Sequence, residues 1–274
     1  MAKKNRRGET VFERAYHERF GARWTELREA LVSPPGYVAL EGGLRKPYYL
    51  DRASALSVSV LTVQPGDRVL DLCAAPGGKS LAVLSRHLKA MQALGEPPPA
   101  RPGIELIANE RSRTRRARLQ RTLREHLPSG WSESVQVTGH DARRWGLHEQ
   151  DAYDHVIADV PCSAERHMLA SPGELERWSP ARPKRLSIDS YAILSAAIAA
   201  ARPGGTVLYL TCALLSDEND EVVAKAVKRH GERITIEVPT LELGVTTEFG
   251  RHVLPDRDGG HGPLYIAKLV KKQS

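Results

Sequence analysis

The sequence predicts an α/β domain with a seven-stranded, mostly parallel sheet, helices on both faces and a small N-terminal helical extension. Short runs rich in Leu and β-branched residues alternate with segments of helical character, and such runs are typical of strands that are buried on both faces. A chain of 274 residues is long enough for one full α/β core but not for two large domains.

The N-terminal extension is expected over residues 1–35, as a basic tail followed by an amphipathic helix. Six large side chains recur at steps of three or four residues, which predicts one helical stripe. They are Phe12, Tyr16, Phe20, Trp24, Leu27 and Leu31. Core packing is favoured for this stripe over a base-stacking surface, and the segment 33–36 (SPPG) ends the helix.

The larger domain is expected over residues 36–274, where strands and helices alternate. The predicted strands are the runs RVLDL, IELIAN, SVQVTG, HVIAD, GTVLYLT, ITIEV and PLYIAKLV. Helices are expected from about Gly78, over the Arg-rich segment and over about 187–201. A long loop separates the last two strands, which can pair antiparallel at one sheet edge, and the proline-rich segment 96–103 is expected to be a surface insertion.

Charge and cysteine content restrict the class of function. The formal net charge of +7 and the seven arginines of Arg111–Arg124 favour a polyanionic partner, with a solvated helix face as the alternative. No membrane span or secretion signal is evident, so we expect a cytoplasmic protein, with an organelle not excluded. Three cysteines without a C-x-x-C pair, and histidines without ligand-like spacing, predict neither disulfides nor a metal site.

A Gly-rich turn follows the first predicted strand, over Asp71–Ser80. Ligands of parallel sheets bind beyond the carboxyl ends of the strands, and small residues here let a ligand reach backbone N–H groups. The turn is neither G-x-G-x-x-G nor a P-loop, so it predicts a nucleotide-like cofactor, with a plain tight turn as the alternative. Glu110 and Asp141 follow the next two strands, where they can bind ribose hydroxyls and an adenine amine, or cap helices.

Two cysteines lie just past the fourth and fifth strands, Cys162 and Cys212, and Asp159 stands three residues before the first. A lone free cysteine is often simply buried, but two at strand ends beside an acid favour thiol chemistry. A thiolate that adds to carbon 6 of cytosine allows carbon 5 to attack an electrophilic methyl group, and an acid at ring N3 assists the addition. Lys79 is the cation expected to lower the pKa of a cysteine.

Three motifs, DLCAAPGGKS, DVPCSAERH and YLTCALLSDENDEVV, resemble the Sun/Nop (RsmB/NSUN-type) RNA cytosine-5 methyltransferases, over about residues 36–270. The resemblance implies a Rossmann-like class I methyltransferase fold that uses S-adenosylmethionine. It implies that Cys212 attacks the base and that Cys162 promotes product release. It places these residues at the cofactor: Cys73, Ala74, Ala75, Pro76, Gly77, Gly78, Lys79, Glu110, Arg115, Asp141, Ala142 and Asp159.

Further segments are most similar to the branch that modifies small-subunit ribosomal RNA in mitochondria: YYLDRASALSV, Arg166-His167 and GGHGPLYIAKL. Ala213 and Glu110 depart from the serine and aspartate that are common in the family. We therefore expect RNA as the partner, ribosomal RNA before tRNA, together with a possible ribosomal or accessory protein, and neither DNA nor a membrane.

Three other classes of function stay open at this point. A DNA cytosine-5 methyltransferase would use Cys162 as its nucleophile and leave Cys212 without a role. A small-molecule methyltransferase would leave both thiols and the basic surface unexplained. A ribosome-assembly factor without activity would fail to bind S-adenosylmethionine. Substitution of each cysteine separates the first of these from the RNA enzyme.

Overall fold

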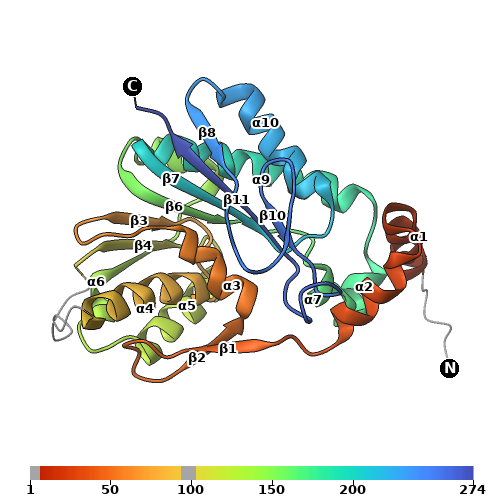
Figure 1. Ribbon diagram of the computed structural model, residues 1–274, viewed down its shortest axis with the longest axis horizontal. Helices are drawn as coiled ribbons and strands as arrows, with labels where there is room; N and C mark the ends of the chain where they lie inside the picture. The colour runs from red at the N-terminus through yellow and green to blue at the C-terminus, as the bar shows by residue number, and fades with distance from the viewer. Residues whose placement is uncertain (1–6, 94–102, 274) are drawn as a thin grey trace.

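The computed structural model describes residues 7–93 and 103–273 (Figure 1). The expected tail over residues 1–6 and most of the expected insertion lie outside these ranges. The helices are α1 (Arg7–Phe20), α2 (Arg23–Val32), α3 (Arg52–Ser57), α4 (Gly78–Ala93), α5 (Arg113–His126), α6 (Trp131–Ser134), α7 (Glu165–Leu169), α8 (Pro172–Glu176), α9 (Ala181–Ala200) and α10 (Asp220–His230), with 3-10 turns η1 (Val58–Val60), η2 (Ala142–Leu147) and η3 (Ser216–Glu218). The strands are β1 (Tyr37–Leu40), β2 (Tyr48–Asp51), β3 (Arg68–Asp71), β4 (Glu105–Asn109), β5 (Val135–Thr138), β6 (Tyr153–Asp159), β7 (Ala201–Thr211), β8 (Ile234–Glu237), β9 (Val245–Thr246), β10 (Arg251–Val253) and β11 (Leu264–Lys271).

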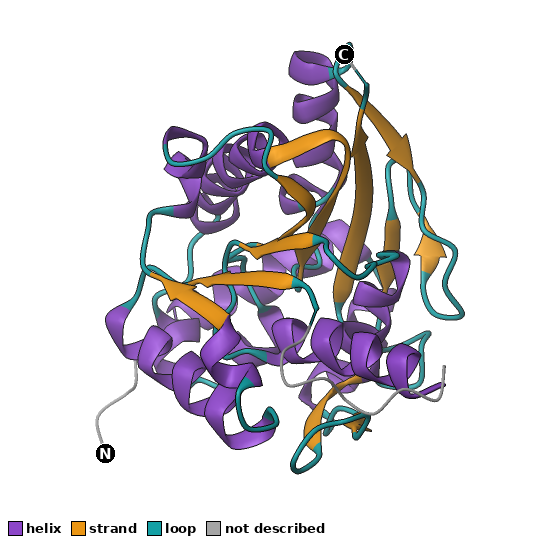
Figure 2. Cartoon of the chain, turned by 90° about the vertical axis from the view of Figure 1, so that its left-hand side faces the viewer, coloured by secondary structure: helices purple, strands orange, loops and turns teal. Residues whose placement is uncertain are grey.

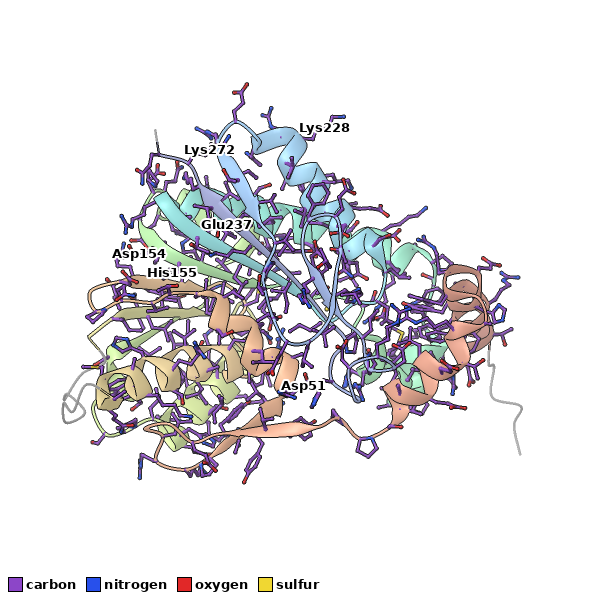
Figure 3. All side chains as sticks on the ribbon, viewed as in Figure 1. Asp51, Asp154, His155, Lys228, Glu237 and Lys272 are labelled. Carbon is purple, nitrogen blue, oxygen red and sulfur yellow. The ribbon has the colours of Figure 1, made fainter. Side chains whose placement is uncertain are left out.

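The central sheet has the order β5-β4-β3-β6-β7-β11-β10-β9, and β8 also pairs with β11. The strands from β5 to β7 are parallel, whereas β11 runs antiparallel to β7. Strand order reverses between β3 and β6, so the carboxyl ends of these strands open toward one crevice. Figure 3 labels Asp154 and His155 near the amino end of β6. It labels Asp51 at the opposite edge of the sheet, where the parallel strands have their carboxyl ends.

Helices cover both faces of the sheet because successive strand residues point to opposite sides. Val69, Leu106 and Leu208 face a core that α4 and α5 complete. Their sequence neighbours Leu70, Ile107 and Val207 face a second core with α9 and α10, as in Figure 2, where helices flank the strands. The predicted α/β class is therefore confirmed.

The predicted strand count is wrong, because the central sheet holds nine strands within the described residues. All seven predicted strands are present, and β9 and β10 are additional. These strands, of two and three residues, form inside the expected long loop, where β10 pairs with β11 and β9 pairs with β10, without a strand pattern in the sequence. The expected antiparallel pair of β8 and β11 forms, but β11 itself lies inside the sheet, next to β7.

The N-terminal stripe is buried, as predicted, but it belongs to two helices and not to one. Gly21 ends α1 with φ +58°, a left-handed conformation that interrupts a right-handed helix, and the chain restarts in α2. Phe12 and Trp24 still meet across the break, with ring centroids 5.8 Å apart. In the part of the chain that the structure describes, no helix is long and apolar enough to cross a bilayer.

Candidate active site

The two cysteines beyond β6 and β7 come into contact. The strands are parallel neighbours in which Asp159 pairs with Leu210, so the loops that leave them start side by side. The Sγ atoms of Cys162 and Cys212 lie 3.0 Å apart, and the backbone N–H of Cys212 donates to Cys162 Sγ at 3.1 Å. Both thiols are free, so either sulfur can donate a hydrogen bond to the other.

The surroundings of Cys162 favour its protonated form. The hydrogen bond to Cys212, reinforced by burial, raises the pKa of Cys162 well above its usual value. Cys162 therefore keeps its proton and can donate it toward the Cys212 sulfur. The third thiol, Cys73, is separate from this pair, and burial raises its pKa as well.

Lys79 lies beside this pair, as the sequence predicted for the local cation. Its Nζ contacts Asp159 Oδ2 at 2.7 Å, and its side chain is only 12% exposed. Burial opposes the charge, but Asp159 and then Cys212 hold the pKa of Lys79 above its ordinary value. An ammonium held in this place can stabilise a thiolate on Cys212.

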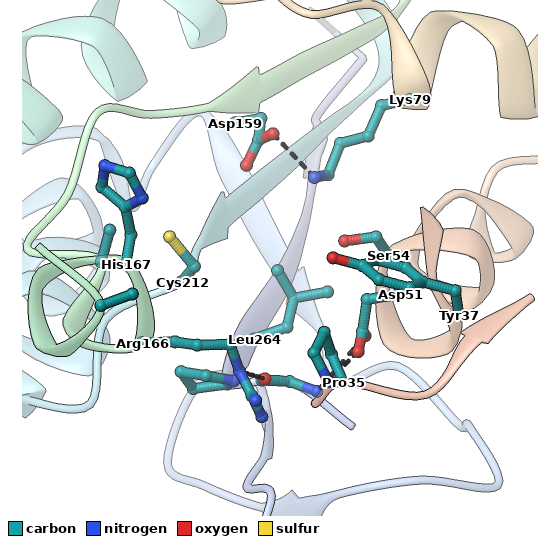
Figure 4. Close-up of a pocket in the computed structure, with 14 residues that line it drawn as sticks. Pro35, Tyr37, Asp51, Ser54, Lys79, Asp159, Arg166, His167, Cys212 and Leu264 are labelled. Atoms are coloured by element: carbon teal, nitrogen blue, oxygen red, sulfur yellow. Dashed lines mark hydrogen bonds and ion pairs between the residues drawn. The ribbon is translucent and has the colours of Figure 1, made fainter. Parts of the chain in front are cut away.

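A cavity of about 510 Å³ opens onto Cys212, Lys79 and Asp159 (Figure 4). Its opposite wall comes from the segment before the sheet, with Tyr37 on β1 and Ser54 on α3. The remaining lining residues are Pro35, Asp51, Ala164, Arg166, His167, Ala170, Gly262, Pro263 and Leu264. Sequence reasoning did not assign these residues to a site; the only signal was that several of them fall in segments similar to one branch of the family.

Arg166 and Asp51 hold that wall in place. The Arg166 guanidinium is part-buried and donates to four backbone carbonyls, those of Leu31, Ser33, Gly260 and Gly262. Asp51 caps α3 through the N–H of Ala53 at 2.8 Å and accepts the N–H of Gly262 at 3.2 Å. Three distant segments of the chain therefore meet at the cavity through charge-assisted hydrogen bonds.

A second cavity, of about 130 Å³, lies at the carboxyl ends of β3 and β4. Five of the residues predicted at the cofactor line it: Cys73, Glu110, Arg115, Asp141 and Ala142. Sequence reasoning did not foresee the other lining residues, Leu72, Asn109, Arg111, Arg143, Pro161, Asp189 and Ile193. The predicted residues Lys79 and Asp159 line the first cavity, while Ala74, Ala75, Pro76, Gly77 and Gly78 line neither of the two.

The Gly-rich turn serves local packing as well as any ligand. Gly77 has φ +117°, which favours glycine, and a Cβ on Gly78 would lie 3.2 Å from the ring of Tyr48. Arg115 ties the turn to the second cavity, since it donates to the carbonyl of Ala75 at 3.0 Å and pairs with Glu110 at 3.3 Å. The alternative of a plain tight turn therefore explains some of the glycines in this segment.

Both acids of the second cavity accept local backbone N–H groups, and Asp141 caps η2, whereas Ser112 and not Glu110 caps α5. Glu110 accepts the N–H of Ser112 at 2.8 Å, and Asp141 accepts the N–H of Arg143 at 3.2 Å. The side-chain hydrogen bond from Arg143, at 2.7 Å, holds the pKa of Asp141 below its usual value. An amine donor that binds in this cavity would therefore share the Asp141 carboxylate with Arg143.

Two buried glutamates cross-link the cysteine loops. Glu165 follows Cys162 and accepts the N–H of Leu214, in the other loop, at 3.2 Å. Glu218 follows Cys212 and accepts both the N–H of Ser163, at 2.9 Å, and its hydroxyl. We call this arrangement the glutamate clasp. Tyr16 of α1 donates to Glu165 at 2.6 Å, so the N-terminal helix contacts it too.

The clasp predicts a dependence of stability on pH. Burial raises the pKa of Glu218 to about 8 from an ordinary value of 4.5. The folded chain then retains a proton that the unfolded chain releases, and the free energy of unfolding falls as pH rises from about 4.5 to about 8. Glu165, with a pKa of about 6, and Asp71, with a pKa of about 7, act in the same direction over narrower windows.

We expect Glu218→Gln to reduce this slope, because a neutral amide has no proton to release. Urea unfolding at several pH values between about 4.5 and 8 measures it. Glu248→Gln, at an exposed position, is the matched control. Equal slopes for wild type and Glu218→Gln would show that this carboxyl ionises alike in the folded and unfolded chain.

The parallel sheet, the Gly-rich turn after β3 and the cavities beyond the strand ends give the fold of class I S-adenosylmethionine-dependent methyltransferases. Within this class, the chain belongs to the family described as 16S rRNA methyltransferase RsmB/F, whose model matches residues 58–270. Within the described residues, no group of three His, Cys, Asp or Glu side chains is placed to hold a metal ion.

Individual relatives agree with this assignment. The 5-cytosine rRNA methyltransferase NSUN4 of Bos taurus is 34% identical over 246 residues, which cover 84% of this chain and 60% of the relative. The mitochondrial tRNA (cytosine(34)-C(5))-methyltransferase of Danio rerio is 35% identical over 245 residues, covering 84% and 62%. NSun6 from Pyrococcus horikoshii, solved with SFG, shares the fold with a TM-score of 0.65 and 23% identity, over 85% of this chain and 55% of that one. The chain thus spans about 60% of the length of these curated relatives.

Proposed function

We propose that the chain transfers a methyl group from S-adenosylmethionine to carbon 5 of a cytosine in RNA, through a transient bond between Cys212 and carbon 6 of the base. One observation carries this proposal. The Cys212 sulfur faces a cavity large enough for a nucleobase, with Lys79 and Asp159 on the same wall and the protonated Cys162 thiol 3.0 Å behind it.

Each residue of this wall has a distinct role in the proposal. The Cys212 thiolate adds to carbon 6, and the Lys79–Asp159 pair carries the proton that ring N3 needs as negative charge develops there. Carbon 5 then takes the methyl group. Afterwards a solvent water accepts the proton on carbon 5, the electrons of that C–H bond restore the C5–C6 double bond, the bond between carbon 6 and the Cys212 sulfur breaks, and N3 returns its proton to the Lys79–Asp159 pair. The Cys162 thiol donates to that departing sulfur.

The lining of the second cavity suits the adenosine end of the cofactor, which supplies an electrophilic methyl group when bound. Leu72, Pro161 and Ile193 give it apolar walls suited to a flat ring, and the carboxylates of Glu110 and Asp141 suit hydroxyl and amine donors. The predicted roles of Cys73, Arg115 and Ala142 in lining this pocket belong to the same proposal.

The placement of the cysteines favours an RNA enzyme over a DNA cytosine-5 methyltransferase. Cys212 lines the first cavity, whereas Cys162 lines neither of the two cavities and lies behind Cys212. A nucleophile must reach the base, so the geometry favours Cys212. The base must leave its stack to enter, at a cost of a few kcal/mol, which is least for an unpaired nucleotide.

The names of the relatives support ribosomal RNA as the substrate, with tRNA as the alternative. We also propose that residues 1–35 are an accessory segment on a methyltransferase domain of residues 36–274, and that a ribosomal or other protein helps to select the target. A cytoplasmic location is part of this proposal, with an organelle as the alternative because the Danio rerio relative is named as mitochondrial.

A transfer assay tests the proposed function. The chain is incubated with cellular RNA and S-adenosylmethionine labelled in its methyl group, and the RNA is then digested and sequenced after bisulfite treatment. We expect label in 5-methylcytosine, at discrete positions. Label in duplex DNA alone, or turnover without any nucleic acid, would contradict the proposal.

A further inference from the structure

The β1–β2 hairpin presents an aromatic face that the proposed reaction does not use. The register pairs Tyr37 with Asp51 and Ala39 with Tyr49, so these four residues share one face. Tyr37 and Tyr49 are 63% and 64% exposed. Of the large apolar side chains that are exposed in the described part of the chain, only these two are aromatic.

The opposite face explains why the hairpin is held firmly. Leu50 is buried, and Leu40 and Tyr48 pack against the core that α4 and α5 form. Tyr48 also contacts His126 edge-on, with ring centroids 5.1 Å apart, and the N–H of Arg45 donates to the carbonyl of His126 at 2.8 Å. The exposed tyrosines therefore stand on a fixed support, which lowers the entropy cost of binding a ligand.

The aromatic face continues into the cavity of Cys212. Tyr37 lines that cavity, and Tyr49 is its diagonal neighbour, about 7–8 Å away across the two strands. A base that leaves its stack to reach Cys212 separates from its neighbours in the strand. Those neighbours then need new surfaces on which to stack, and aromatic side chains provide them for unpaired RNA.

Positive charge lies beside the hairpin, at its turn and along α5. Arg45 and Lys46 are exposed in the hairpin turn, and α5, which the hairpin contacts, carries further exposed arginines. Among the described ion pairs and hydrogen-bonded side chains, none involves the guanidinium groups of Arg45, Arg113, Arg118, Arg121 or Arg124. By contrast, Arg111, Arg115 and Arg116 bind Asp141, Glu110 and backbone carbonyls. The free arginines suit a phosphate backbone and not an apolar protein partner.

We propose that the outward face of the β1–β2 hairpin, with Tyr37 and Tyr49, is a stacking surface for unpaired nucleotides next to the target base in single-stranded RNA. The inference rests on the proposed function and extends it from the reacting base to its neighbours. Stacking carries no charge, so these tyrosines contribute affinity that salt does not screen, whereas the arginines contribute affinity that it does.

Fluorescence anisotropy with the full chain and a labelled single-stranded RNA, measured over a salt series, tests the inference. Tyr49→Ala is the cleaner variant, because Tyr49 does not line the Cys212 cavity. We expect Tyr49→Ala and Tyr37→Ala each to weaken binding by roughly 5- to 100-fold, while the slope of log affinity against log salt concentration stays unchanged. Phenylalanine at either position should restore the affinity. Arg118→Gln should instead reduce the slope by about 0.7. Leu147→Ala, which removes an even more exposed apolar side chain elsewhere, is the control.

The outcomes separate this inference from the proposed function. If wild type methylates RNA and both alanine variants bind it as tightly as wild type, the stacking surface is refuted and the reaction stands; a protein partner then becomes the better occupant of this face. If the alanine variants lose affinity with a lower salt slope, or if phenylalanine fails to restore binding, stacking is also refuted. Failure of wild type to methylate any RNA would instead refute the proposed function.

Discussion

Cys212→Ala is expected to reduce RNA methylation by more than about 1,000-fold, to the background of the assay. Without a sulfur at this position no covalent bond to carbon 6 forms, and carbon 5 of cytosine stays a poor nucleophile. The measurement is incorporation of labelled methyl into RNA under single-turnover conditions, which separates the chemical step from product release.

Binding of S-adenosylmethionine, followed by calorimetry, is the control for Cys212→Ala, because the second cavity does not include Cys212. We expect the affinity for the cofactor to stay within about two-fold of wild type. A variant that binds the cofactor and still methylates RNA at the wild-type rate would show that Cys212 is not the nucleophile.

Cys162→Ala is expected to accumulate a covalent complex between protein and RNA. The variant keeps the Cys212 sulfur that adds to the base but lacks the thiol 3.0 Å away that assists its departure. The adduct should migrate as a slower band on a denaturing gel and disappear after digestion with ribonuclease. Most of the protein should be trapped within one turnover, whereas wild type shows only a trace.

The double variant Cys162→Ala/Cys212→Ala is the matched control and should give no adduct. The DNA-type alternative predicts no adduct from Cys162→Ala, because the nucleophile is then lost, and only the wild-type trace from Cys212→Ala. The two single variants therefore decide between the sulfurs on one gel, without reference to the rate of methylation.

Strand ends were the most informative feature of the sequence. Hydrophobic runs placed β3, β4, β6 and β7 in one parallel sheet, and residues after parallel strands converge at one edge whatever the loops do. This is why Cys162, Cys212, Lys79 and Asp159 could be brought together before any contact was known. The two acids at Glu110 and Asp141 followed from the same rule.

The rest of the site depends on contacts between distant segments, which local patterns do not encode. Tyr37 and Ser54 reach the cavity only because Leu40 and Tyr48 anchor the hairpin to the core. Arg143 also pairs with Asp141, although its position in the sequence suggested only a cofactor ligand or a helix cap. Gly21 likewise divides a stripe whose spacing fits one helix, because a single left-handed residue barely alters the periodicity on either side.

The glutamate clasp limits how the active loops can be exchanged between relatives. Each loop supplies the carboxylate that satisfies a backbone N–H in the other, through Glu165 to Leu214 and Glu218 to Ser163. A chimera that takes only one loop from a homologue with different spacing would leave a buried acceptor and a buried donor unsatisfied. The two loops and Tyr16 therefore have to be transferred together when this chemistry is grafted onto another scaffold.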